Sequence, residues 1–280
     1  KAEHPELHAE LLHAGCRELG FEGMLTDLHR ARYRPQPGDR DFAVLTSRRT
    51  TLELVIRRYV ERHPNVRLVS ETFVRGLLVK QLPEGLRVLG VSAADADGGR
   101  DIIGDVVIDA GGRTSSGVEQ LIEAGAAISE EAENAEILFF PRHYRLHPGV
   151  SEPPRGKAST TGDLGFLKFG LFPADNGCFS ITLCVHELEL EMRKALVDPA
   201  VFDAACARLP GLAPWVAPET AAGVSRVFGM GDLHSRWRTL ASGDTPSVLG
   251  YFAIGDNLIR TNPLYGRGCS FAAVTAYLLR

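Results

Sequence analysis

The sequence lacks any grouping of cysteines that would bind a metal or form a redox pair. Its five cysteines stand at positions 16, 178, 184, 206 and 269. They include no C-x-x-C pair and no zinc-ligand spacing. An odd, scattered set is typical of a reducing compartment, so we expect free thiols and a cytoplasmic location. His4 and His8 lie one helical turn apart without a third ligand, which favours a solvated helix face over a metal site.

Long apolar runs and blocks of one charge are also absent. No run approaches the roughly 20 apolar residues that cross a membrane, and no signal peptide is visible. The net charge of −4 comes without a basic cluster, which argues against a nucleic acid partner. The 280 residues are 44% hydrophobic and 24% charged, as in ordinary globular proteins of one or two domains. We therefore expect a small organic molecule as the partner, and the sequence gives no indication of the oligomeric state.

Several catalytic and nucleotide-binding motifs are missing as well. There is no Walker A sequence, no G-x-S-x-G and no H-E-x-x-H. The dinucleotide fingerprint G-x-G-x-x-G is not found either, since Gly229-Met230-Gly231 lacks the third glycine and a βαβ context. These absences remove the common P-loop, hydrolase and metalloprotease classes from consideration.

A strand, a glycine-rich loop and a helix follow one another near the C-terminus. Residues 248–254 are apolar and aromatic, which predicts a buried strand. Gly255-Asp256 ends that strand, a loop runs through Pro263, Gly266 and Gly268, and a helical pattern begins at Cys269. Open α/β folds bind ligands at such a strand end, where the following helix offers N–H groups to an electron-rich ligand. An ordinary strand-to-helix connection is the alternative.

A second strand end lies in the sequence DVVIDAGGRTSS, residues 105–116. The apolar residues 106–108 are followed by Asp109, Gly111, Gly112 and Arg113, and a helix is expected from Glu119 to Ala127. Glycines at a strand end allow a ligand to approach the backbone closely. A strand end followed by a simple turn is the alternative.

Two arginines precede the strongest helical pattern of the chain, residues 50–63. Arg48 and Arg49 stand where the helix dipole disfavours a positive charge, which suggests a bound anion. The planar guanidinium suits phosphate oxygens, and we prefer Arg48 for that role. Surface arginines at a helix start are an equally good interpretation.

The remaining pattern predicts strands separated by turns and short helices. We expect a helical segment at 1–29, strands at 42–45, 66–70, 74–80, 86–91, 101–108, 137–146, 165–173, 178–185, 224–230, 234–240 and 248–254, and helices at 187–196 and 199–208. Ala174-Asp175-Asn176-Gly177 indicates a hairpin turn.

Three stretches, taken in order, resemble motifs of the FAD-dependent monooxygenase and geranylgeranyl-reductase superfamily of flavoproteins. They are the arginine segment at 48–49, D-A-G-G-R-x-S at 109–115 and G-D…P-x-x-G-x-G at 255–268. The resemblance implies that Asp256 binds the ribityl chain, that the loop after Pro263 lies against the isoalloxazine, and that the strand ending at Asp109 lies near the pyrophosphate. It implies these cofactor-binding residues: Arg48, Asp109, Gly111, Gly112, Arg113, Gly255, Asp256, Pro263, Gly266 and Gly268.

The resemblance also implies a fold class and a domain plan. We expect an α/β (α+β) protein with a Rossmann-like FAD/NAD(P)-binding domain, residues 46–134 and 246–280, and an inserted antiparallel β-sheet substrate domain, residues 1–45 and 135–245. The family's first motif, G-x-G-x-x-G, is missing here, the chain starts at Lys1 without methionine, and it stops at Arg280 inside a helical pattern. We therefore expect a fragment that lacks the N-terminal unit.

The implied function is that of an FAD-dependent oxidoreductase. Within this class we expect first a monooxygenase that hydroxylates a small organic substrate with NAD(P)H as electron donor. A flavin-dependent reductase of isoprenoid double bonds is an alternative, because the P-x-x-G-x-G loop fits that branch too. A non-catalytic descendant of the fold is another. Halogenation is disfavoured, since Trp215 and Trp237 stand in no W-x-W-x-I-P motif.

Overall fold

The computed structural model describes residues 3–154 and 158–279 and divides into two compact units. The first unit comprises residues 1–67 and 136–231, and the second comprises residues 68–135 and 232–280. Two segments, 46–67 and 232–245, and the single residue 135 belong to the other unit than the predicted domain boundaries place them in. The predicted functional division of the chain stays a prediction.

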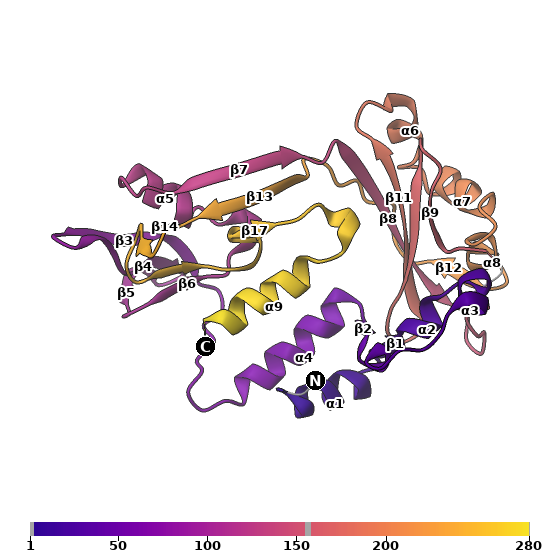
Figure 1. Ribbon diagram of the computed structural model, residues 1–280, viewed down its shortest axis with the longest axis horizontal. Helices are drawn as coiled ribbons and strands as arrows, with labels where there is room; N and C mark the ends of the chain where they lie inside the picture. Colours follow the sequence, from indigo (N-terminus) through magenta and orange to yellow (C-terminus); the bar gives the residue numbers. More distant parts are fainter. Residues whose placement is uncertain (1–2, 155–157, 280) are drawn as a thin grey trace. The chain divides into compact units, whose positions relative to one another are not determined.

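A five-stranded antiparallel sheet is the main element of the first unit (Figure 1). Its order is β12-β8-β11-β10-β9, and a separate hairpin pairs β1 with β2. The strands are β1 (Arg17–Gly20), β2 (Ala43–Thr46), β8 (Ile137–Leu146), β9 (Thr161–Asp163), β10 (Lys168–Pro173), β11 (Cys178–His186) and β12 (Ala221–Gly223). The helices are α1 (Pro5–His13), α2 (Phe21–Met24), α3 (Asp27–Arg32), η1 (Asp39–Asp41), α4 (Arg49–Glu61), α6 (Leu190–Ala195), α7 (Pro199–Ala207) and α8 (Ala213–Val216).

Aromatic packing builds the core of the first unit on one face of that sheet. Tyr144 of β8 stacks on Phe179 of β11 with ring centroids 5.2 Å apart, and Trp215 of α8 meets Phe179 edge-on at 5.1 Å. Phe202 of α7 is fully buried in the same cluster. Because successive side chains of a strand point to opposite faces, one face of the sheet packs in this core, and the other face of β8, β10 and β11 points away from it.

Small sheets and two longer helices make up the second unit. The meander β3-β4-β5 lies beside the parallel pair β6-β16, the three-stranded β17-β13-β7 and the hairpin β14-β15. The strands are β3 (Phe73–Leu82), β4 (Gly85–Asp95), β5 (Gly98–Ile103), β6 (Val107–Asp109), β7 (Ser129–Asn134), β13 (His234–Thr239), β14 (Ala241–Ser242), β15 (Thr245–Pro246), β16 (Tyr251–Ala253) and β17 (Ile259–Arg260). The helices are η2 (Gly112–Thr114), α5 (Gly117–Glu123), η3 (Gly255–Asn257), η4 (Pro263–Tyr265) and α9 (Gly268–Leu278).

The expected mixture of helices and antiparallel sheets is confirmed, with four local corrections. The predicted helical segment at 1–29 is interrupted, because Gly15 takes a left-handed φ of +97° after α1 and β1 follows, before the chain becomes helical again in α2 and α3; residues 1 and 2 lie outside the described part. The predicted strand at 101–108 is two strands, β5 and β6, in different sheets. The predicted strands at 66–70 and 224–230 are absent, since neither segment finds a continuous partner strand and only Met230 forms a bridge, to Phe139.

Candidate functional site

The two predicted cofactor motifs of the second unit end neighbouring parallel strands. Residues Val107, Ile108 and Asp109 of β6 pair in register with Tyr251, Phe252 and Ala253 of β16. The N–H of Ile254 donates to the carbonyl of Asp109 at 3.1 Å, so the ladder continues to the strand ends. After each strand the backbone turns into a short 3-10 helix, η2 after β6 and η3 after β16, and the two helices lie next to each other. The structure therefore brings together two stretches that are more than 140 residues apart in sequence.

Glycines with left-handed backbone angles form both turns. Gly112 has a φ of +64°, and a Cβ built on it would lie 4.0 Å from the Cβ of Asp256. Gly255 has a φ of +58°, and its N–H donates to the Oγ1 of Thr275 in α9 at 3.2 Å. An L side chain is strained at such angles, so glycine is the residue that allows each strand to turn sharply toward the other.

A hollow of about 350 Å³ opens beside Asp256. Its lining includes five of the residues predicted from sequence: Arg113, Asp256, Pro263, Gly266 and Gly268. Sequence reasoning missed five further polar or reactive lining residues: His234, Arg260, Thr261, Arg267 and Cys269. Asp109 and Gly111 line a second hollow of about 350 Å³ with residues of η2 and α5. Arg48 belongs to the first unit, whereas the other nine predicted residues belong to the second.

The two acids at the strand ends have different surroundings. Asp109 accepts hydrogen bonds from the N–H of Gly111 at 2.9 Å, from the hydroxyl of Ser115 and from the phenol of Tyr251 at 2.8 Å. Its carboxylate is thus engaged in holding the turn. By contrast, the carboxylate of Asp256 accepts no side-chain or backbone hydrogen bond from any other described residue, and it borders the hollow. Of the two acids, Asp256 is the one available to a ligand.

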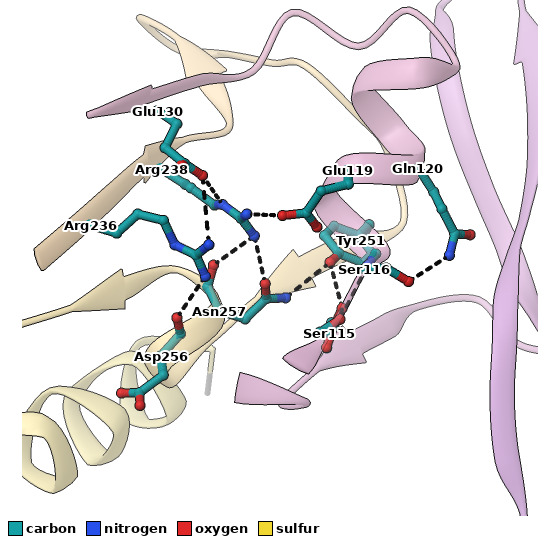
Figure 2. Close-up of polar contacts among 12 residues, drawn as sticks. Ser115, Ser116, Glu119, Gln120, Glu130, Arg236, Arg238, Tyr251, Asp256 and Asn257 are labelled. Carbon is teal, nitrogen blue, oxygen red and sulfur yellow. Dashed lines mark hydrogen bonds and ion pairs between the residues drawn. The ribbon is translucent and has the colours of Figure 1, made fainter. Parts of the chain in front are cut away.

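A buried network lies behind both turns (Figure 2). Arg238 of β13 is only 3% exposed, and its Nη1 donates to the side-chain oxygen of Asn257 at 2.8 Å. The amide of Asn257, itself fully buried, donates to the hydroxyl of Tyr251 at 3.3 Å, and Tyr251 donates to Asp109. The route therefore connects β13, η3, β16 and β6 through side chains alone.

Carboxylates from two other elements balance the charge of Arg238. Its Nη2 bonds to Glu119 of α5, and its Nε donates to Glu130 of β7 at 2.7 Å. Burial raises the pKa of the Tyr251 phenol, and its hydrogen bond to Asp109 raises it further. Tyr251 is therefore a neutral donor, which suits its place between the amide of Asn257 and the carboxylate of Asp109.

Arg236, two residues before Arg238, reaches the turn directly. Its Nη2 donates to the backbone carbonyl of Asp256 at 3.3 Å, as Figure 2 shows. Burial lowers the pKa of Arg236, and the neighbouring charge of Arg238 lowers it further. Its Nε is buried and has no hydrogen-bond partner among residues 3–154 and 158–279. This side chain fixes the backbone on which Asp256 is carried.

The first unit contains a different buried acid, Asp175, in the predicted hairpin turn. Its side chain is fully buried and accepts hydrogen bonds from Nε and Nη2 of Arg48 at 2.9 and 2.6 Å and from the N–H of Arg48 at 2.6 Å. Thr51 adds a bond at 3.0 Å. Burial raises the pKa of Asp175, but the bonds from Arg48, Asn176 and Thr51 outweigh burial and lower it well below its usual range.

The arginines at the start of α4 predict a bound anion, and the carboxylate of Asp175 provides a negative charge at that place. A carboxylate at a helix N-terminus is favoured by the dipole and by the N–H groups there. Nε and Nη2 of Arg48 are already engaged by this protein carboxylate, so the predicted contact of Arg48 with a pyrophosphate stays a prediction. Sequence reasoning identified residues 174–177 as a hairpin turn and did not include Asp175 in a site.

The described residues contain no group of three or more histidine, cysteine or acidic side chains that could hold a metal ion. His8 instead bonds to Glu18 at 3.0 Å. No helix within the described residues is long and apolar enough to cross a membrane. The five cysteines are all free thiols, as expected.

No family model and no curated protein matches the chain. Among solved structures, it is similar to PqsL, a probable FAD-dependent monooxygenase from Pseudomonas aeruginosa, with 20% identity, a TM-score of 0.66, and coverage of 97% of this chain and 69% of PqsL. The flavin-dependent brominase Bmp2 gives 18% identity, a TM-score of 0.63, and coverage of 97% and 63%.

A third similar structure is the myxobacterial chondrochloren halogenase CndH, with 16% identity, a TM-score of 0.63, and coverage of 88% of this chain and 53% of that protein. The chain thus spans about 63% of the brominase and about half of this halogenase. These likenesses confirm the predicted fold: the chain has the fold of FAD-dependent monooxygenases and halogenases.

Proposed function

We propose that the protein is an FAD-dependent oxidoreductase and that the strand ends of β6 and β16 bind the flavin cofactor. One observation carries the proposal: two glycine turns meet at the ends of a parallel strand pair, with the carboxylate of Asp256 unengaged at the edge of a hollow. Strand ends of this kind are where open α/β folds bind ligands. The likeness of fold to FAD-dependent enzymes supports the choice of flavin among nucleotide cofactors.

The residues present fit such a cofactor. Cβ atoms added at Gly112 and Gly268 would point at Asp256, at 4.0 Å from its Cβ and 3.8 Å from its Oδ1, so the absence of side chains leaves this side open. The carboxylate of Asp256 can accept hydrogen bonds from sugar-like hydroxyls. The first-turn N–H groups of α9, next to Gly266 and Gly268, have no acceptor within the helix and can donate to an electron-rich ring edge.

The flavin supplies the redox chemistry when bound, and the chain supplies orientation, charge and exclusion of water. Asp256 would hold the cofactor, while Arg236 and Asn257 hold Asp256 and its turn from behind. Arg113, Arg260 and Arg267 border the same hollow and would favour the anionic form of the ligand. We name no side-chain acid or base in the reaction.

Within this class we propose a monooxygenase that uses NAD(P)H and inserts oxygen into a small organic substrate. The absent W-x-W-x-I-P motif argues against halogenation. The loop Pro263–Gly268 suits an isoprenoid reductase as well, and this reductase is the second candidate. A cytoplasmic location belongs to the same proposal, because all five thiols are free.

The test uses the full-length protein, purified and scanned for bound flavin. Stoichiometric FAD, with oxygen consumption that depends on NAD(P)H and substrate, is the expected result. Reduction of an alkene without oxygen would move the assignment to the reductase, and halogenated product in the presence of bromide or chloride would move it to a halogenase. Full-length protein that is folded yet takes up no flavin would contradict the proposal as a whole.

A further inference from the structure

The first unit carries a hollow on the face of its sheet that lies opposite the aromatic core. In the register of the sheet, His143 of β8, Ser180 of β11 and Phe172 of β10 form one cross-strand row. Tyr144 and Phe179, their neighbours in sequence, point into the core instead. The hollow measures about 500 Å³ and lies between this row, Arg145 and the start of α4. A space of that size takes a small organic molecule.

Among the described residues, the charged groups that line this hollow are all basic, and two of them are already paired. Arg48 bonds to Asp175, and Arg49 bonds to Glu53 at 2.6 Å. Arg145 is exposed and, within the described part of the chain, has no ion-pair partner. The excess positive charge is therefore concentrated at Arg145, beside His143.

Hydroxyl groups complete the polar side of the hollow. Ser47, Ser180 and Ser225 line it, and Ser225 accepts a hydrogen bond from the N–H of His143 at 3.0 Å. Phe172 is 54% exposed and adds an apolar ring to the same lining. The chemistry of this lining suits an anionic group attached to an apolar body.

A second hollow, about 480 Å³, adjoins the first and has a different lining. The two share Ser47, Phe172 and Pro173. Among residues 3–154 and 158–279, no charged side chain lines the second hollow, whose further lining consists of leucine, valine, alanine, serine and threonine: Leu19, Leu25, Thr26, Val44, Leu45, Thr46, Ala158, Ser159, Thr160, Thr161 and Leu171. Val44 is 51% exposed there, although it is aliphatic. An apolar group that covered Val44 would gain free energy from the area removed from water.

We propose that these two adjoining hollows bind an amphiphilic organic anion. Its anionic group lies at Arg145 and His143, and its apolar body lies over Phe172 toward Leu25 and Val44. A carboxylate suits the planar guanidinium, because two N–H groups can bind its two oxygens. The positive charge of Arg145 disfavours cationic molecules. Small polar anions should bind more weakly than amphiphilic ones, because they have no apolar group to bury in the second hollow. That this ligand is the substrate of the enzyme rests on the proposed function, whereas the binding itself does not.

The experiment is calorimetry on the full-length protein with four probes: benzoate, 4-butylbenzoate, 4-butylbenzyl alcohol and 4-butylbenzylamine. We expect 4-butylbenzoate to bind about tenfold more tightly than benzoate, because its butyl group is buried. We expect the alcohol to bind at least about tenfold more weakly than 4-butylbenzoate, since Arg145 then lacks its charged partner. The amine should bind most weakly.

Two variants separate the two hollows. Arg145→Met should bring the carboxylate and the alcohol to similar affinity. Val44→Asp should remove the advantage of the butyl group and leave benzoate binding within about twofold. Arg193→Met, an exposed arginine of α6 that lines neither hollow, is the matched control and should bind as the wild type does. Thermal melts verify that each variant is folded.

Equal affinity for all four probes, or no binding of 4-butylbenzoate by folded wild-type protein, would overturn the proposal, and neither outcome depends on a variant. An Arg145→Met protein that is folded and still prefers the carboxylate would overturn it as well. The proposed function can fail independently of this site. If the protein binds 4-butylbenzoate as expected but takes up no flavin, the anion site stands and the oxidoreductase assignment is wrong.

Discussion

Arg238 donates a hydrogen bond from Nη1 to the side-chain oxygen of Asn257 at 2.8 Å, with both residues buried. This contact ties β13 to the turn that follows Gly255-Asp256. Asn257 in turn reaches Tyr251, whose phenol bonds to Asp109. The two strand ends of the proposed flavin site are thus connected to each other from inside the protein as well as by backbone pairing.

Arg238→Met should therefore destabilise the second unit by about 3 kcal/mol. The substitution leaves Asn257 without its donor and Glu119 without its partner, while Glu130 keeps only Arg236 at 3.8 Å, and breaking an ion pair whose arginine is buried has a cost of that order. Urea unfolding measures the loss. Arg100→Met is the matched control, because the Arg100 side chain is 49% exposed in its pair with Asp95 and its loss should cost under about 1 kcal/mol. Similar losses for both variants would contradict the role of the network.

Asp175 should make the stability of the first unit sensitive to acid. Its folded-state pKa is lowered, so its contribution is fully present above its unfolded pKa of about 3.9 and is lost as pH falls through the folded value. We expect Asp175→Asn to cost about 2 kcal/mol at pH 7, since the amide leaves donors of Arg48 and Thr51 unpaired.

Thermal midpoints of wild type and Asp175→Asn from pH 7 to pH 3 give the measurement. The difference between the two proteins should be constant at neutral pH and should narrow only below about pH 4. A difference that is unchanged at pH 3, or one that narrows already at pH 6, would show that the ionised carboxylate is not what stabilises this turn.

Cys269 should be the one cysteine of the native protein that thiol reagents modify quickly. It is exposed at the start of α9, whereas the other four are buried, and burial raises the pKa of Cys184 and of Cys206 to about 12. Labelling at pH 8 should follow one fast phase, which Cys269→Ser abolishes. Because Cys269 borders the hollow at Asp256, added FAD should slow that phase; an unchanged rate with FAD bound would place the flavin elsewhere.

Gly112→Ala tests the glycine turn of η2 against a control with the same backbone strain. Gly112 and Gly243 have φ of +64° and +58°, and Gly243 lies in the open turn between β14 and β15. Each alanine should cost about 1 kcal/mol of stability through its left-handed angle. FAD affinity should fall at least about tenfold for Gly112→Ala alone, because only this methyl group enters the proposed site. Equal FAD binding by the two variants would argue against close approach of the ligand at Gly112.

The linear motifs were predictable because each signals its structure locally. Gly255-Asp256 after an apolar run, and Gly111-Gly112 after another, predict strand ends with sharp turns, and both turns are present. Asn257 directly follows Asp256, so the same local pattern predicts that it lies in the turn. That its amide is buried and bonded to Arg238 depends on a strand 19 residues away in sequence.

The residues that sequence reasoning missed act through distant partners. Asp175 reads as a polar residue of a hairpin turn, and only its contact with Arg48, 127 residues away, makes it a buried cap of α4. Arg238 looks like one of several alternating basic residues in β13. The predicted strand at 66–70 fails for the converse reason: its apolar pattern is adequate, but pairing requires a neighbouring strand that the fold does not provide.

The most direct test of the account is the dissociation constant of FAD for the full-length protein and for Asp256→Ala, measured by flavin fluorescence. Asp244→Ala in the β14–β15 turn of the same unit is the control, an acid that lines none of the hollows described above. We predict that the affinity falls at least about tenfold for Asp256→Ala and is unchanged for Asp244→Ala, because only Asp256 would bind cofactor hydroxyls. Flavin affinity equal to that of the wild type in a folded Asp256→Ala protein would contradict the account.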